Sequence, residues 1–246
     1  IRLKQFQDKS HEEMLTAAAK LRKEGTLAGV LLDLRNNPGG LVDEASEIAD
    51  EFLEGGTIYT MRRRGQTIEE ERAKAGGAFT QIPVVVLVNE WSASASELLT
   101  GALQDHKRAM VVGAATFGKG SVQTILSLPS GAGLKLTIAR YFTPSGHAIQ
   151  ADGIHPDVLL ETSTRLAADG GAPVIRERDL ENHLAPEGPQ GGAPPEPRSR
   201  DAGAPGTPAP TSESLTVADV PADPTTSKDL VLRTGYQLLR SKIEGR

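Results

Sequence analysis

Hydrophobic and polar residues alternate with two periods along residues 1 to about 161, and this pattern predicts both strands and helices. Residues 30–34 and 84–88 are short apolar runs, and the second, Val-Val-Val-Leu-Val, is typical of a strand buried on both faces. Apolar residues recur at helical spacing in three stretches, 10–24, 41–52 and 95–103. Strands and helices therefore alternate, which predicts parallel βαβ units with helices covering a sheet.

Helix boundaries and further strands follow from local signals. Ser10 and Glu13 have the pattern of a capping box, so we expect a helix to begin at Ser10 and to end at Gly25. Residues 1–6 alternate apolar and polar, as a strand does. Other strand-like segments are 110–112, a hairpin within 57–80, and a pair, 122–126 and 134–141, around the turn at 129–131. The expected fold class is α/β with a β-rich extension.

The composition changes after residue 161. Residues 162–224 are rich in Ala, Gly and Pro, and such a segment buries too little apolar surface to offset its ordering entropy. We therefore predict a disordered linker there. Within residues 225–246 we predict a C-terminal helix from about Ser227 to Ile243. An apolar stripe at helical spacing indicates it, formed by Leu230, Leu232, Tyr236, Leu239 and Ile243.

Bulk composition excludes several classes of protein. The 246 residues carry a net charge of -5, so no overall positive charge favours nucleic acid. The absence of cysteine excludes disulfides, thiolate zinc sites and cysteine nucleophiles. No two histidines have the spacing of a metal motif, so no metal is expected. No apolar run approaches the ~20 residues of a membrane span, and no signal peptide opens the chain.

The chain also begins within a strand-like segment and without an initiating Met. We therefore expect it to be the later part of a longer precursor, so that its location in the cell has to be inferred indirectly.

Three serines stand between the buried strand at 84–88 and the helix that follows it. In Ser92-Ala93-Ser94-Ala95-Ser96, a serine at the helix start lies beside unpaired backbone N–H groups and the positive end of the helix dipole. These are the requirements for a nucleophile beside an oxyanion hole. The alternative is that the serines only cap the helix, since Ser is a favoured N-cap residue, and the pattern by itself favours that reading.

Residues 113–121 almost match the phosphate-binding loop G-x-x-x-x-G-K-[ST]. Gly120 stands where the Mg²⁺-binding hydroxyl belongs, and the residues that follow are strand-like instead of helical. A nucleotide-binding loop is therefore one alternative, and a solvated turn is another. Glycines on both sides of Lys119 also let the backbone approach another element closely and carry the lysine inward.

The loop at residues 36–40, Asn-Asn-Pro-Gly-Gly, ends a buried strand and opens a helix. It is made of turn-forming residues, so a simple turn explains it. It also offers N–H groups at a helix start, which a functional loop would use. The pattern does not choose between the two interpretations.

Several motifs in fixed order resemble those of the C-terminal processing peptidases, also called tail-specific proteases. They are LLDLRNNPGGL at 31–41, SASASE at 92–97, GALQD at 101–105, FGKGSVQ at 117–123, YFTPSGHAIQ at 141–150 and GIHPDV at 153–158. They span most of residues 1–161, and the resemblance implies that these residues are a peptidase catalytic core. Residues 227–239 also resemble the C-terminal helix of that family.

The resemblance implies a role for six residues. The nucleophile is the middle serine, Ser94, and the base is Lys119 of the F-G-K-G motif. Gln123, four residues after the lysine, orients it. The oxyanion hole combines the N–H of Ala95 with that of one glycine of the N-P-G-G loop, Gly39 or Gly40.

The implied reaction is hydrolysis of peptide bonds near protein C-termini through an acyl-enzyme, without a cofactor. A free lysine has a pKa of about 10.4 and is charged at neutral pH, so burial must lower that pKa by about 3 before Lys119 acts as a base. On an extended segment, Lys119 and Gln123 would face the same side.

The resemblance also implies a crotonase/ClpP-like core, protein or peptide substrates, and a periplasmic or otherwise extracytoplasmic location, with membrane association through a missing N-terminal segment. It admits a regulatory or adaptor protein and a homo-oligomer as partners. Nothing in the sequence corresponds to the PDZ domain of the family, and His147 stands where Arg is common. A catalytically inactive substrate-binding homologue is the remaining alternative.

Overall fold

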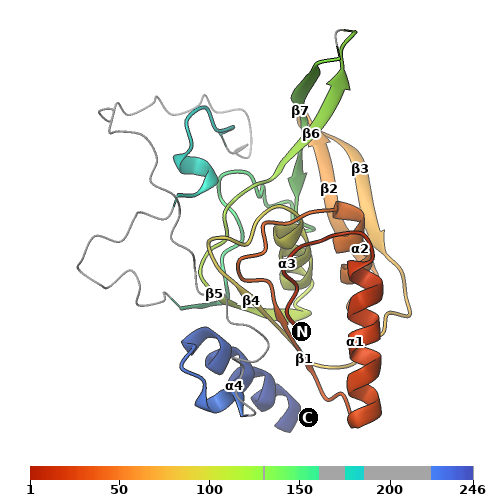
Figure 1. The fold of residues 1–246 in the computed structure, drawn as a ribbon, viewed down its shortest axis with the longest axis vertical. Helices are drawn as coiled ribbons and strands as arrows, with labels where there is room; N and C mark the ends of the chain where they lie inside the picture. Colours follow the sequence, from red (N-terminus) through yellow and green to blue (C-terminus); the bar gives the residue numbers. More distant parts are fainter. Residues whose placement is uncertain (130, 161–174, 186–222, 246) are drawn as a thin grey trace, which may run out of the picture.

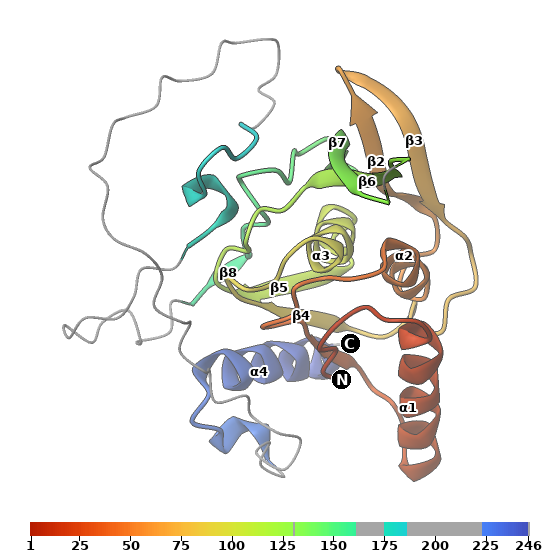
Figure 2. The ribbon, with the colours of Figure 1, turned by 45° about the horizontal axis from the view of Figure 1, so that its top comes forward.

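The computed structural model describes residues 1–129, 131–160, 175–185 and 223–245. Within these residues the elements form layers, which Figures 1 and 2 show from two directions. A parallel sheet lies at the centre, with helix α4 (Leu230–Glu244) on one face. Helices α2 (Val42–Asp50) and α3 (Ala95–Asp105) cover the other face, and an antiparallel sheet lies beyond them. The α/β class and the C-terminal helix predicted from the sequence are confirmed.

The parallel sheet has the strand order β1-β4-β5-β8. Its strands are β1 (Val30–Asp33), β4 (Val84–Val88), β5 (Ala109–Gly113) and β8 (Val158–Leu159). Every residue of β4 is buried, because its side chains alternate between two apolar clusters. Val84, Val86 and Val88 join the cluster under α2 and α3, whereas Val85 and Leu87 pack against α4. The predicted strand buried on both faces is confirmed.

The antiparallel sheet is the predicted β-rich extension, with the order β3-β2-β7-β6. Its strands are β2 (Gly56–Arg63), β3 (Gln66–Ala73), β6 (Ser121–Ser127) and β7 (Gly133–Phe142). A register irregularity interrupts β6 between Val122 and Gln123. The hairpin of β6 and β7 extends away from the helices, at the top of Figure 1. β6 therefore begins two residues after Lys119, at Ser121, and leads away from the parallel sheet.

Two local predictions near the N-terminus are wrong. Residues 1–6 form only isolated bridges, Arg2 with Asp33 and Phe6 with Gly40, instead of a strand. Helix α1 (Ser10–Glu24) does begin at Ser10, but no capping box forms, and the hydroxyl of Ser10 accepts a hydrogen bond from the N–H of Gln7. The carboxylate of Glu44 in α2 accepts from the N–H groups of Lys9 and His11 instead. A tertiary contact thus replaces the local cap.

Part of the predicted linker differs from the prediction. Residues 162–174 and 186–222 of this linker lie outside the described residues, so the prediction for them stays a prediction. Residues 175–185 contain a short 3-10 turn, Glu177–Asp179, and the N–H of Glu177 donates to the carbonyl of Phe117 at 3.1 Å. This short segment therefore contacts the core. Among the described residues, no helix is both long and apolar enough to span a membrane.

Candidate active site

Ser94 occupies a strained turn between β4 and α3. Its backbone dihedrals are φ 56° and ψ -117°, a region that non-glycine residues rarely adopt. Such strain costs free energy and is retained where the surrounding contacts enforce it, which is common at functional sites. Helix α3 begins at the next residue, Ala95, so Ser94 stands at its N-terminal end. The turn presents the hydroxyl where the helix dipole favours negative charge.

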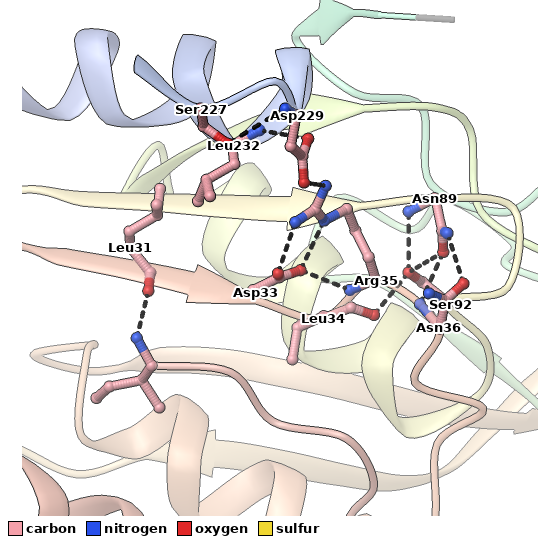
Figure 3. Close-up of polar contacts among 11 residues, drawn as sticks. Leu31, Asp33, Leu34, Arg35, Asn36, Asn89, Ser92, Ser227, Asp229 and Leu232 are labelled. Atoms are coloured by element: carbon pink, nitrogen blue, oxygen red, sulfur yellow. Dashed lines mark hydrogen bonds and ion pairs between the residues drawn. The ribbon is translucent and has the colours of Figure 1, made fainter. Parts of the chain in front are cut away.

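The two flanking serines hold the backbone. The hydroxyl of Ser92 donates to the carbonyl of Leu34 at 2.9 Å and accepts from the N–H of Asn89 at 3.0 Å (Figure 3). The hydroxyl of Ser96 donates to the carbonyl of Asn37 at 2.9 Å. Both side chains are fully buried, whereas Ser94 is only partly buried. Ser94 is the N-cap residue of α3 and forms a capping box with Glu97, so the predicted cap is present there, whereas Ser92 and Ser96 hold neighbouring backbone instead of capping the helix.

The loop at residues 36–40 lies against this turn. Gly39 has φ 99°, and a Cβ there would lie 2.8 Å from Cβ of Ser94 and 3.0 Å from N of Ala95. A side chain at residue 39 would therefore collide with the turn at Ser94. Gly40, at φ 142°, faces the N-terminal segment, where a Cβ would meet the carbonyl oxygen of Phe6 at 1.9 Å. The structure thus brings Gly39 and Ala95 together with Ser94.

A buried carboxylate joins the two halves of the site. Glu97, in the first turn of α3, is fully buried and accepts four hydrogen bonds. On one side the N–H of Ser94 donates at 2.7 Å. On the other, the N–H groups of Gly118 and Lys119 donate at 2.7 and 2.9 Å, and the hydroxyl of Thr116 donates at 2.5 Å. Glu97 therefore fixes the backbone of Lys119 relative to that of Ser94.

The environment of Glu97 acts on its pKa in two directions. Burial raises the pKa from its ordinary value of 4.5 to about 7, although hydrogen bonds from Thr116, Gly118, Lys119 and Ser94 favour the ionised form. An ionised carboxylate only accepts hydrogen bonds, and all four groups that contact Glu97 are donors. Sequence reasoning missed this residue, but the spacing Ser94-x-x-Glu97 before an apolar helix is a capping-box signal that could have found it.

The Lys119 side chain does not meet the burial expected for a general base. The residue is exposed, and in the part of the chain that the structure describes no hydrogen bond joins its side chain to Ser94 or Gln123. Gln123 is also exposed, and it follows the register irregularity of β6, so the simple alternation expected from Lys119 is interrupted. The flanking glycines carry the backbone of Lys119 inward, but not its amine. The prediction of a buried lysine is wrong here.

The opposite side of the lysine loop is held by Gln150. Its side chain is fully buried and accepts from the N–H of Gly120 at 3.1 Å. It donates to the carboxylate of Glu177 at 2.9 Å and to the carbonyl of Leu184 at 3.3 Å. The N–H of Ala151 donates to the carbonyl of Gly118. The backbone around Lys119 is thus fixed from α3 and from the segment at residues 175–185.

The nucleotide-binding alternative does not agree with this geometry. The N–H groups of Gly118 and Lys119, which a phosphate would need, donate to Glu97. The residues after the loop form strand β6, so no helix N-terminus follows. The anion at this loop is the protein's own carboxylate.

The fold is that of an α/β protein with a strained serine turn at a strand-to-helix junction. The chain belongs to peptidase family S41, whose family model matches residues 1–160.

Individual relatives of this chain are processing proteases, in agreement with the family match. A carboxy-terminal-processing protease of Bartonella bacilliformis is 39% identical over 99% of this chain and 52% of its own length. A carboxyl-terminal-processing protease of Picosynechococcus sp. is 49% identical over 65% of this chain and 38% of its own. The solved structure of a photosystem II D1 C-terminal processing protease is 39% identical, with a TM-score of 0.62, over 65% of this chain and 41% of that one. The chain thus spans about half or less of the length of these proteins.

Glu97 generates a testable prediction about stability and pH. A folded-state pKa of about 7, above the ordinary 4.5, contributes stability that is present below pH 4.5 and lost as the pH rises through 7. The free energy of unfolding of the wild type, minus that of Glu97→Gln, should therefore decrease from pH 4.5 to 7 and then level off. Urea unfolding across this range measures it. A difference that increases with pH would mean that the four donors outweigh burial.

Proposed function

We propose that this chain is the catalytic part of a serine endopeptidase that cleaves near protein C-termini, with Ser94 as nucleophile and Lys119 as base. One observation carries the proposal: the strained turn of Ser94 is hydrogen-bonded through Glu97 to the backbone of Lys119. Membership of family S41 and the names of the relatives support the reaction and the kind of substrate.

The reaction has two steps. The Ser94 hydroxyl attacks the peptide carbonyl while its proton passes to Lys119, and the amine of the leaving peptide then takes that proton as the C–N bond breaks. Lys119 next takes a proton from water, whose oxygen attacks the ester of the acyl-enzyme. As the ester C–O bond breaks, Lys119 returns that proton to the Ser94 oxygen and the second product leaves. No cofactor enters either step.

The oxyanion formed in each step is bound by backbone N–H groups in this proposal. Ala95 supplies one, as the first residue of α3. The N–H of Gly39 already donates to the side-chain oxygen of Asn37 at 2.9 Å, so it would have to leave that partner to bind the oxyanion. Gly40 is exposed beside it and is the second candidate.

The exposed amine of Lys119 sets a condition on the mechanism. A lysine accepts a proton only in its neutral form, and removal of surrounding water favours that form. We infer that bound substrate, or a further part of the protein, covers Lys119, and that Gln123 then orients it. The observed exposure also favours the alternative of an inactive, substrate-binding homologue, which the second prediction below tests.

The proposal includes the finer architecture and the location. The parallel strand order β1-β4-β5-β8, with α2 and α3 between the two sheets, supports a crotonase/ClpP-like core. The periplasmic or otherwise extracytoplasmic location is carried over from the family resemblance.

Substitution of the three serines tests the nucleophile. Ser94→Ala should abolish hydrolysis of an unstructured protein substrate and leave the fold intact, because only that hydroxyl reacts. Ser92→Ala and Ser96→Ala each remove a buried hydrogen bond, so they should lower the melting temperature and retain turnover. The measurements are cleavage rate and thermal unfolding for all three variants. An active Ser94→Ala protein would exclude the assignment.

Replacement of Lys119 tests the base. Lys119→Arg should be as inactive as Lys119→Ala, since a guanidinium stays protonated and cannot accept a proton. Single-turnover cleavage of the same substrate gives the rates of both variants. Lys74→Arg, in an exposed position outside the site, is the matched control and should retain wild-type activity. Substantial activity of Lys119→Arg would mean that the lysine acts only as a charge, and wild-type inactivity would support the inactive homologue.

A further inference from the structure

Arg35, directly before the loop at residues 36–40, is clamped by two carboxylates from distant parts of the chain (Figure 3). Its guanidinium donates twice to Asp33, from Nε at 2.9 Å and from Nη2 at 2.8 Å. On the other side Nη1 donates to Asp229 at 2.6 Å. All three side chains are 11–13% exposed, so this ion-pair network is largely shielded from solvent. Shielding makes its loss more costly than that of a surface pair.

Asp229 is the N-cap residue of the C-terminal helix and makes two separate contacts there. Its Oδ1 accepts from the N–H of Leu232 at 3.0 Å and caps α4, while Oδ2 binds Arg35. The helix is itself fixed on the central sheet, where Leu232 and Leu239 pack with Leu87 in the second apolar cluster. The position of Asp229 is therefore set by the sheet face opposite to α3.

The loop that follows Arg35 is hydrogen-bonded to the nucleophile turn. The N–H of Asn36 donates to the side chain of Asn89 at 2.9 Å, and the two side chains bond again at 2.8 Å (Figure 3). The carbonyl of Asn37 accepts from the N–H of Ala93 and the hydroxyl of Ser96. A rotation of the chain at Arg35 would therefore displace Gly39 relative to Ser94.

We propose that Asp229 is a positioning residue for the active site: it fixes Arg35 and thereby the loop that brings Gly39 beside Ser94. Asp33 alone binds one edge of the guanidinium, and Asp229 completes the clamp from α4. The C-terminal helix thus acts on the catalytic turn from the opposite face of the sheet. The effect on catalysis rests on the proposed function, whereas the effect on the loop does not.

The test separates the ion pair from the helix cap. Asp229→Asn keeps an Oδ1 that can cap α4, because Asn and Asp cap about equally well, and it removes the charge that binds Arg35. The matched control is Asp223→Asn, an exposed cap in the same segment whose partner is Thr225. Asp229→Glu restores the negative charge. Hydrolysis kinetics and hydrogen–deuterium exchange of residues 36–41 are measured for each protein.

Asp229→Asn should lower kcat by about tenfold and change KM little, since misplaced catalytic groups affect the chemical step more than binding. It should also speed amide exchange in residues 36–41. Asp229→Glu should recover part of both, and Asp223→Asn should match the wild type.

Three results would overturn the proposal. The first is amide exchange of residues 36–41 that is unchanged in Asp229→Asn, and the second is a decrease in kcat that is fully explained by a smaller folded fraction. The third is an Asp229→Glu protein whose kcat and exchange equal those of Asp229→Asn. If the wild type cleaves nothing, the proposed function fails, and the exchange of residues 36–41 still decides the role of Asp229.

Discussion

The site depends on one buried carboxylate that binds two segments of backbone. Glu97 accepts from Ser94 on one side and from Gly118 and Lys119 on the other, 20 or more residues along the chain. An isolated buried charge would be very unfavourable, and four donors and the positive end of α3 offset part of that cost, which leaves the pKa of Glu97 raised. Because a carboxylate has fixed geometry, the strained turn and the lysine loop are placed together.

Two further constraints act from outside this hub. Gln150 connects the backbone around Lys119 to residues 175–185, and Arg35 connects the loop at residues 36–40 to α4. Both outer partners come from the region after residue 161, beyond the stretch that the family model matches. The geometry around Ser94 and Lys119 is therefore coupled to segments that lie outside the matched core.

The sequence was sufficient to predict the main helices and strands and much of the site. It was insufficient where tertiary contacts determine how a residue is capped or buried. Periodicity predicted β4 and α3, and ordered motifs placed Ser94, Gly39 and Ala95 together. The same reasoning could not anticipate that Glu44 caps α1, or that the Lys119 amine is exposed, because both depend on which elements pack nearby. The composition of residues 162–224 likewise concealed a segment that contacts Gln150. Glu97 was within reach, since its spacing from Ser94 is a local signal.

The central claim is that this geometry makes Ser94 the reactive serine. Labelling the intact chain with a serine-reactive fluorophosphonate, followed by digestion and mass-spectrometric mapping, tests it most directly, because Ser92, Ser94 and Ser96 are resolved by fragmentation of one peptide. The account predicts a single adduct on Ser94, formed more slowly in Glu97→Gln than in the wild type. An adduct on Ser92 or Ser96, or no adduct in a folded protein, would contradict it.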